Sequence, residues 1–409
     1  MWHPWKGLGG LRREVWILFA TMLVNRTGTM VLPFMVLYLT RDLAFGPIEA
    51  GLVVSAYGVA ALAAAPLSGW MCDRTDPLRI MRWSLLLSGL CLLAFPLART
   101  HRAVFAATLV WSLVAEMFRP ANMALLAAFS TPDQRKAAYA LNRMAINLGM
   151  SVGPALGGFL AEVSFLWLFV VNGSACLISG LVLTAGTRWA AGHEGKPEAM
   201  EPVIAEGMRG KTGGALSDWP FILFLVALVP VLLVFFQLTS TLPLDVTGRL
   251  GLPESTFGLL FTVNTLIIVA LEIPLNLAMA KWSHRWTMVT GCALVAAGFG
   301  ATGFATGFWS AAATVVVWTF GEMVLFPGSA AFVAEAAPPQ RRGQYMGLYT
   351  MAFSLAFAAG PALGTLVYGK AGPHALWGGA AALGALSAAL MAWAMVGANT
   401  RISGGAAPG

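Results

Sequence analysis

Twelve long apolar runs restrict what this chain can fold into. They lie at residues 15–40, 47–71, 80–98, 104–130, 138–161, 164–187, 219–244, 255–280, 287–307, 309–334, 343–369 and 375–397. A helix that crosses a bilayer needs about 20 apolar residues, so each run is long enough for one span. Only 11% of the 409 residues are charged, whereas about a quarter are charged in soluble domains. The sequence therefore predicts an all-α membrane protein with twelve transmembrane helices.

The second half of the chain repeats the first at a distance of 207 positions. Trp111 recurs as Trp318, and the string GPALG at 153–157 recurs at 360–364. Pro120, Pro132 and Arg135 recur in the same way as Pro327, Pro339 and Arg342. A period this long indicates duplicated halves, and repeated membrane proteins tend to place their site between the repeats. We predict two pseudo-symmetric six-helix halves, residues 1–187 and 219–409, joined by a polar cytoplasmic linker at 188–218.

The basic residues indicate how the chain is oriented. With both termini inside, 18 of the 25 Lys and Arg fall in cytoplasmic segments and 5 in outer loops. Cytoplasmic loops of multi-pass proteins are enriched in Lys and Arg, so we predict cytoplasmic termini. The net charge of +7 is then a topology signal and implies no nucleic-acid partner. The first apolar run continues to span length, so no cleavable signal peptide is expected.

Three charged residues lie deep inside apolar runs. Glu116 and Arg119 are three residues apart, on one face of the fourth predicted helix, and Arg26 lies near the middle of the first. A charge at this depth costs about 3 kcal/mol or more, so such groups face a cavity or one another. A glutamate that gains and loses an arginine partner can take up and release a proton. We interpret the three as a proton-coupling group; the alternative is a static ion cluster that holds two helices together.

Two further glutamates, Glu322 and Glu272, lie in runs of the second half without a nearby cation in sequence. Each is either protonated or exposed to a wet cavity, which suits a proton site or a site that binds a cation. Glutamates and aspartates at the ends of runs are instead expected to be solvated: Glu14, Glu162, Asp245 and Glu335. The cysteines and histidines show no metal-ligand spacing, and we find no phosphate-binding loop or nucleophile motif. The sequence thus predicts no metal site, no enzyme and no ATP-driven pump.

The loop between the second and third runs carries a recognisable motif. Gly69, Asp73, Arg74 and Arg79 resemble the Gly-x-x-x-Asp-Arg-x-Gly-Arg-Lys loop of the major facilitator superfamily, although residues 76–78 depart from it. The resemblance implies an inner gate in which the aspartate faces the start of the eleventh helix, where a carboxylate is favoured by the helix dipole. The basic residues expected beside this gate are Arg135 and Arg342.

The fifth run carries a stripe of small residues. It consists of Gly149, Gly153, Pro154, Gly157 and Gly158. This stripe resembles the antiporter motif of the drug–proton antiporter branch of the superfamily. Small residues let two helices approach closely and proline adds a bend, so the stripe can seal the route between the two faces. The alternative is ordinary helix packing, which the copy at 360–364 favours.

The resemblance covers essentially the whole chain. NRTGTMVLPFMVLYL in the first run and EMFRPANMAL in the fourth are similar to the lactococcal multidrug transporter type, and Arg119 matches the fourth-helix arginine of the antiporter branch without its following glycine. The resemblance implies alternating access about a central cavity, lined by helices 1, 4, 7 and 10, in a bacterial cytoplasmic (inner) membrane. Beside Glu322 and Glu272, the side chains expected to contact substrate are Trp111, Met117, Phe235, Phe236 and Trp318.

The leading hypothesis is a proton-coupled secondary transporter that exports lipophilic cations or drugs by antiport. One alternative is proton-coupled transport of an anionic or zwitterionic solute (a peptide, sugar acid or lipid), held by Arg26 and Arg119. Another is a membrane sensor or scaffold that does not transport. We expect no cofactor besides the coupling protons. The expected partners are a small-molecule substrate and the lipid bilayer, with the protein as a monomer.

Overall fold

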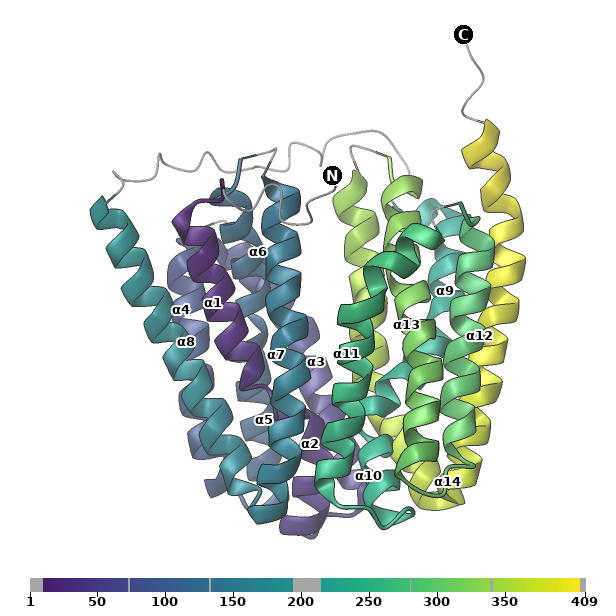
Figure 1. Ribbon diagram of the computed structural model, residues 1–409, viewed down its shortest axis with the longest axis horizontal. Helices are drawn as coiled ribbons and strands as arrows, with labels where there is room; N and C mark the ends of the chain where they lie inside the picture. The colour runs from purple at the N-terminus through teal and green to yellow at the C-terminus, as the bar shows by residue number, and fades with distance from the viewer. Residues whose placement is uncertain are drawn as a thin grey trace. The chain divides into compact units, whose positions relative to one another are not determined.

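The computed structural model describes residues 10–72, 74–131, 134–193, 215–279, 281–338 and 341–404. Every regular element in these ranges is a helix (Figure 1). Helices satisfy their backbone N–H and C=O groups internally, which is the requirement that a bilayer imposes on spans. The chain is therefore an all-α membrane protein. Asp73, which the sequence analysis assigned to a gate, lies outside the described residues, as does most of the predicted linker.

The described helices account for the twelve predicted spans. Ten segments are long and apolar enough to cross a membrane. One of them, Gly343–Met395, contains a break at Gly372, where φ is +84°, and so comprises two helices. The 19-residue helix α12 (His284–Thr302) is not among the ten and supplies the remaining span.

Packing divides the described chain into two units, each of which is a helical bundle. Residues up to Leu43, together with Ala56 to His193, form the N-terminal unit. The C-terminal unit consists of Ala44–Ser55 and of the chain from Ala215 to Gly404. The Ser55 hydroxyl oxygen accepts a hydrogen bond from the Ala362 amide at 2.9 Å, which shows why these early residues group with the later part of the chain.

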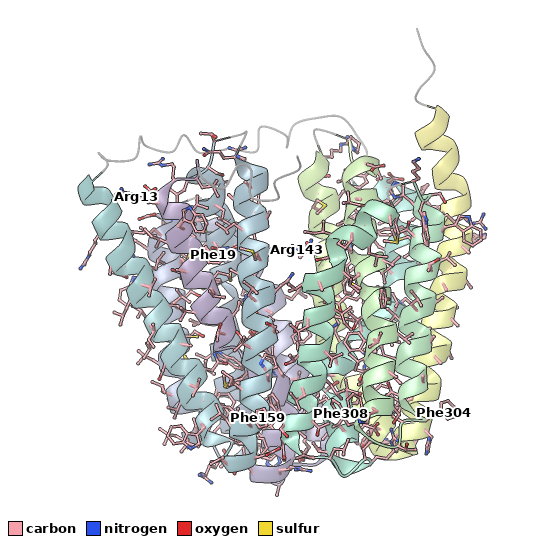
Figure 2. The ribbon with its side chains drawn as sticks, in the orientation of Figure 1. Arg13, Phe19, Arg143, Phe159, Phe304 and Phe308 are labelled. Carbon is pink, nitrogen blue, oxygen red and sulfur yellow. The ribbon has the colours of Figure 1, made fainter. Side chains whose placement is uncertain are left out.

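The N-terminal unit contains the first six spans. Its helices are α1 (Arg13–Thr27), α2 (Val31–Leu37), η1 (Tyr38–Asp42), α3 (Pro47–Cys72, from Ala56 onward), α4 (Pro77–Ala94), η2 (Phe95–Leu97), α5 (His101–Glu116), α6 (Phe118–Ala128), α7 (Arg135–Val163) and α8 (Leu166–His193). Exposed apolar side chains cover the outside of the bundle, as Phe159 on α7 illustrates (Figure 2). This surface suits contact with lipid.

The C-terminal unit contains the other six spans. Its helices are η3 (Ala215–Ser217), α9 (Trp219–Phe235), η4 (Phe236–Thr239), α10 (Thr241–Gly248), α11 (Glu254–Ala278), α12, α13 (Phe308–Ala336) and α14 (Arg342–Gly404). Phe304 and Phe308 project at the connection between α12 and α13 (Figure 2). Phe304 is 85% exposed, as an aromatic residue at a membrane boundary can be.

The first span of each unit is broken rather than continuous. In the N-terminal unit, α1 ends at Thr27 and α2 begins at Val31. The amides of Met30 and Val31 both donate to Asn172 Oδ1 from α8, at 3.3 and 3.2 Å. In a bilayer such orphaned amides need a partner, so Asn172 makes the break tolerable.

The equivalent break in the C-terminal unit lies at η4 and is held by Gln237. Its amide donates to the carbonyl oxygens of Leu233 and Gly360 at 2.8 and 2.9 Å. Its Oε1 accepts from the Ser240 and Thr241 hydroxyls at 3.2 and 2.9 Å. The buried Gln237 side chain thus makes four hydrogen bonds at the break in the helix.

Two of the four glutamates and aspartates predicted to be solvated are buried. Asp245 is 0% exposed and binds Arg249 through both carboxylate oxygens, at 2.8 and 2.7 Å. Trp377 Nε1 also donates to this carboxylate, at 3.1 Å. Glu14 is buried beside Arg12. The prediction was wrong because both carboxylates have an arginine partner nearby in sequence, and Asp245 also accepts from the distant Trp377.

The Asp245–Arg249 pair fastens three helices of the C-terminal unit together. Arg249 also donates to the carbonyl oxygens of Ala305 and Thr302, both at 2.8 Å. The hydrogen bonds that the Arg249 guanidinium donates to Asp245 raise the pKa of this guanidinium. All four contacts of this guanidinium lie within the C-terminal unit.

We predict that Arg249→Leu destabilises the protein by about 3 to 5 kcal/mol, because it leaves the Asp245 carboxylate buried without its bidentate partner. Reversible unfolding in mixed detergent micelles measures the change. Arg102→Leu, at an exposed position in the first turn of α5, is the matched control and should be near neutral. Equal effects of the two substitutions would contradict the structural role of the pair.

Candidate functional site

The candidate site begins at the break in the first span. Arg26 lies in the last turn of α1, where the negative end of the helix dipole favours a cation. Its Nε is buried and has no hydrogen-bond partner among the described residues. An unsatisfied guanidinium nitrogen in a membrane span is costly, so this group points to a site that binds a further polar group.

The glycine stripe of α7 packs against this break. A Cβ at Gly149 would collide with the Cβ of Arg26 and lie 2.8 Å from the Arg26 carbonyl carbon. A Cβ at Gly153 would lie 2.9 Å from the carbonyl oxygens of Arg26 and Thr27. At Gly157 it would lie 2.8 Å from Met30. These glycines therefore set the position of the chain that carries Arg26.

A proline kink places the second charged pair. Pro120 has no N–H to donate to the carbonyl of Glu116, four residues earlier, and the fourth span is interrupted at Met117, between α5 and α6. At this interruption the Ser68 hydroxyl of α3 donates to the Met117 carbonyl at 2.9 Å. Glu116 is consequently the last residue of α5.

The two carboxylate oxygens of Glu116 have different partners. Tyr57 of α3 donates its hydroxyl to Oε1 at 2.8 Å, and Arg119 Nε lies 3.2 Å from Oε2. Glu116 is largely buried, with 16% of its side chain exposed, whereas the Arg119 side chain is 64% exposed. The carboxylate is therefore held by a fixed hydroxyl on one side and by an accessible guanidinium on the other.

Arg26, Tyr57, Glu116 and Arg119 line one cavity of about 80 Å³ inside the N-terminal unit. Its remaining polar lining comes from α1, α4 and α8: Asn25, Thr29, Ser84, Ser88, Asn172 and Cys176. Trp111 closes one wall, with its ring centroid 4.9 Å from that of Tyr57. A cavity of this size and polarity suits small hydrogen-bonding molecules such as water. The structure thus brings together the three charges that the sequence analysis grouped.

In the C-terminal unit, Glu322 lies in a second polar cluster. The Asn264 amide of α11 donates to Glu322 Oε2 at 2.9 Å and to Thr319 Oγ1 at 3.0 Å. Glu272 lies two turns further along α11, and its backbone carbonyl accepts a hydrogen bond from the Asn276 amide at 2.7 Å. Asn264 thus joins Glu322 and Thr319 in one hydrogen-bonded cluster.

In the C-terminal unit, a phenylalanine occupies the position equivalent to Arg119. This residue, Phe326, lies 4.9 Å from Phe235 and 5.3 Å from Phe353 between ring centroids. Phe236 and Phe235 are part-buried, and Met117 in the other unit is as well. Trp318 is only 1% exposed and stacks on Phe299 at 5.2 Å. Of the predicted substrate-contacting aromatics, Trp318 is core packing in this conformation.

The predicted gate is only partly described. Arg74 lies over the ring of Trp70 at 4.2 Å from its centroid, and Arg79 and Arg135 are exposed. Open space surrounds Gly69. Asp73 and the Arg342 side chain are outside the described residues, so the gate stays a prediction.

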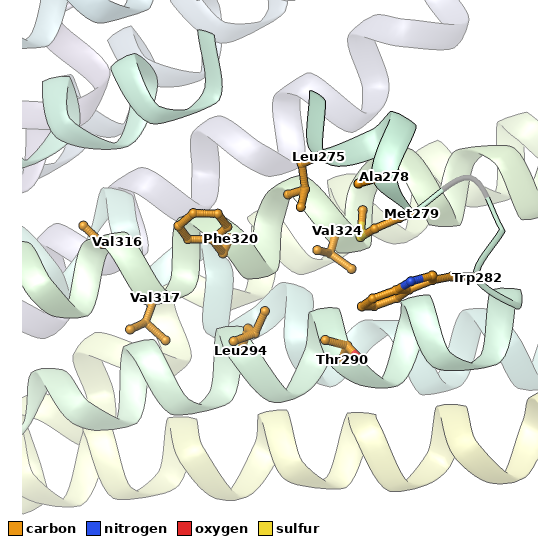
Figure 3. A pocket seen from close by; sticks show the side chains of 10 residues that line it. All are labelled: Leu275, Ala278, Met279, Trp282, Thr290, Leu294, Val316, Val317, Phe320 and Val324. Carbon is orange, nitrogen blue, oxygen red and sulfur yellow. The ribbon is translucent and has the colours of Figure 1, made fainter. Parts of the chain in front are cut away.

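A larger cavity, of about 380 Å³, lies in the C-terminal unit away from these charges. It is walled by α11, α12 and α13, with Leu275, Trp282 and Phe320 among its lining residues (Figure 3). None of its lining residues is ionisable. It can hold an apolar group and offers no group for proton or charge chemistry.

Sequence reasoning did not identify Tyr57, Asn264 or Asn172. The sequence of an apolar run does not indicate which groups a neutral polar residue in it contacts. One signal was available, because Tyr57 and Asn264 are 207 positions apart, which is the repeat distance already seen in Trp111 and Trp318.

Comparisons with known proteins assign the family. The sequence profile of the Major Facilitator Superfamily matches residues 17–249 and 226–406. The chain is 24% identical to a Na(+), Li(+), K(+)/H(+) antiporter of Planococcus maritimus, over 81% of this chain and 84% of the relative. It is 24% identical to the quinolone resistance protein NorA of Staphylococcus aureus, over 41% of this chain and 44% of NorA.

A solved structure with the same fold is a peptide transporter of the POT family. The TM-score is 0.81 at 16% sequence identity, with 95% of each chain covered. This likeness establishes the fold alone.

We predict that Gly149→Ala destabilises the protein by about 1 to 3 kcal/mol, because the added methyl group must displace α1 at Arg26. Intrinsic helix propensity alone would favour alanine by about 1 kcal/mol, so the sign of the change is diagnostic. Gly378→Ala on α14, where nothing lies within 4 Å of the new Cβ, is the control. Unfolding in mixed micelles measures both, and an unaltered Gly149→Ala protein would show that the α1–α7 contact is loose.

Proposed function

This chain belongs to the Major Facilitator Superfamily, and we propose that it is a proton-coupled antiporter that exports lipophilic cations across the bacterial cytoplasmic membrane. It is a multi-pass secondary transporter rather than an enzyme. The proposal concerns the coupling ion, the substrate class, the membrane and the cytoplasmic position of both termini. One observation carries it: a buried carboxylate, Glu116, whose cationic partner is exposed.

Proton coupling follows from the two partners of Glu116. When Glu116 is ionised, Arg119 at 3.2 Å balances its charge and Tyr57 donates to the other oxygen. When Glu116 takes a proton, the guanidinium loses its counter-charge and is free to turn, since its side chain is 64% exposed. A hydroxyl both donates and accepts, so Tyr57 can stay bonded in either state. Protonation of Glu116 therefore releases the Arg119 guanidinium, while the Tyr57 hydroxyl stays bonded to the carboxyl group.

The substrate class follows from the C-terminal unit. Phe235, Phe326 and Phe353 form an aromatic cluster, and Glu322 on α13 supplies a carboxylate one turn from Phe326. Aromatic faces and a carboxylate together favour lipophilic cations. The relative named as a quinolone resistance protein supports drugs as cargo, and the relative named as a cation/proton antiporter supports exchange for protons.

A second candidate is transport of an anionic or zwitterionic solute. Arg26 Nε has no partner among the described residues, and Arg119 is accessible beside it. Two guanidinium groups at one cavity would bind a carboxylate or phosphate. This candidate shares the proton-coupling group and differs in the residue that binds the cargo. A sensor or scaffold would show no solute flux at all.

We predict that Glu116→Gln reduces efflux driven by a pH gradient at least about tenfold, because a glutamine cannot carry the coupled proton. Exchange of labelled substrate at equal pH on both sides should continue. Proteoliposomes loaded with tetraphenylphosphonium, Na(+) or K(+) in parallel measure flux with and without the gradient. Glu162→Gln, at an exposed position near the end of α7, is the control. Full gradient-driven flux in Glu116→Gln would refute the coupling role.

We predict that Glu322→Gln weakens binding of tetraphenylphosphonium about tenfold or more, or about 1.4 kcal/mol, because the counter-charge is lost. Binding of an anionic compound should be unchanged. Equilibrium binding to purified protein measures both. If Arg26→Gln instead removes binding of the anion and Glu322→Gln leaves cation binding intact, the anionic or zwitterionic cargo replaces the cation.

A further inference from the structure

The two units contain a similar polar arrangement at nearly the same sequence distance. Tyr57 and Asn264 are 207 positions apart, and Ser112 and Thr319 are as well. Glu116 and Glu322 are separated by 206. In each unit the second span sends a hydrogen-bond donor to a glutamate of the fourth, at 2.8 Å from Tyr57 and 2.9 Å from Asn264. The duplication has kept this contact while it changed the donor.

The donor differs in what it can do. The Ser112 hydroxyl donates to the backbone oxygen of Tyr57 at 2.6 Å, so this contact does not involve the tyrosine hydroxyl that donates to Glu116. The Thr319 hydroxyl donates to the Val315 carbonyl at 2.6 Å, so its oxygen must accept from Asn264. This fixes the NH₂ group of Asn264 toward both Thr319 and Glu322, and the amide oxygen points elsewhere.

A fixed N–H donor distinguishes between the two forms of a carboxyl group. The carboxylate accepts a stronger, charge-assisted hydrogen bond from it than the carbonyl oxygen of a protonated carboxyl group does, and the Asn264 NH₂ group cannot accept the O–H of the protonated form. Asn264 is 4% exposed and Thr319 fully buried, so water does not replace these bonds easily. A hydrogen bond to the charged form stabilises it.

We propose that Asn264 is a positioning residue that keeps Glu322 ionised, so that the C-terminal unit presents a standing negative charge to a cationic substrate. Tyr57, which serves both forms of Glu116, leaves the proton exchange to the N-terminal unit. The inference rests on the proposed function for the identity of the substrate. The ionisation state of Glu322 does not depend on the proposed function, because it can be measured without a substrate.

The effects of other ionisable groups on the helices that pack against α13 have to be distinguished from the effect of Glu322. They include Glu272 on α11, His284 and Arg285 on α12, and Tyr349 on α14. His284 binds Glu335 at 2.9 Å and Tyr349 lies 2.7 Å from the Ser329 hydroxyl, both toward the last turns of α13. Glu272→Gln is therefore made in parallel with every variant below.

The first test measures the protonation of Glu322 directly. Dicyclohexylcarbodiimide reacts with protonated carboxyl groups in apolar surroundings, and mass spectrometry of peptides from the full-length protein locates the adduct. We expect low labelling of Glu322 in the unaltered protein at pH 6 to 8, and labelling about tenfold higher in Asn264→Leu. Asn276→Leu, on the same helix but bonded to the Glu272 backbone carbonyl, is the matched control. Equal labelling in Asn264→Leu and unaltered protein would overturn the proposal.

The second test measures binding of tetraphenylphosphonium, whose charge does not depend on pH. Asn264→Leu should weaken binding more at pH 6 than at pH 8, Asn264→Gln should retain it, and Asn264→Leu should add nothing in a Glu322→Gln background. An undiminished effect in that background would overturn the proposal. If Asn264→Leu does not fold, Thr319→Val, which releases the orientation of the amide, should move both readouts in the same direction. If the unaltered protein binds no cation, the proposed substrate is wrong, and the labelling alone decides the role of Asn264.

Discussion

An ionised carboxylate inside an apolar helix bundle needs partners, and this requirement shapes the N-terminal unit around Glu116. A charge at this depth costs about 3 kcal/mol or more, and the partners come from different helices, Tyr57 on α3 and Arg119 on α6. Ser68 and Ser112 tie the same helices together through backbone oxygens of Met117 and Tyr57. A movement of α3 against α5 and α6 therefore alters the surroundings of the carboxyl group directly.

The duplicated scaffold solves the same structural problem with different residues. Both first spans break at the equivalent place, and the glycine of the neighbouring helix faces the break in each case, Gly157 at Met30 and Gly364 at Gln237. The orphaned amides of the first break are satisfied from another helix by Asn172. In the second break, Gln237 itself provides the hydrogen bonds. The two halves thus share the backbone geometry of the break, whereas different side chains satisfy the backbone groups at each break.

The spans, the duplication and the grouping of Arg26, Glu116 and Arg119 could be predicted from the sequence, because apolar length and intramembrane charge are strong local signals. The break between α1 and α2 in the first span was not predicted, since glycine is common in membrane helices and does not always interrupt them. The burial of Asp245 was missed because Trp377, and the Thr302 and Ala305 carbonyls that bind its partner Arg249, are brought to it only by the fold. Asn264 was missed because a neutral amide has no signature until its neighbours are known.

Neutral donors decide what a buried carboxyl group does, more than the count of charges around it. A hydroxyl adapts to either protonation state, and an amide whose second hydrogen is already committed does not. Tyr57 and Asn264 occupy equivalent positions, so the two halves differ at this point by one donor. Because Arg119 is replaced by Phe326 at the neighbouring equivalent position, the half with the adaptable donor also has the exchangeable cation, and the half with the fixed donor has aromatic rings. The change of donor and the change from arginine to phenylalanine fit together. An arginine beside Glu322 would neutralise the carboxylate that we propose to bind a cationic cargo.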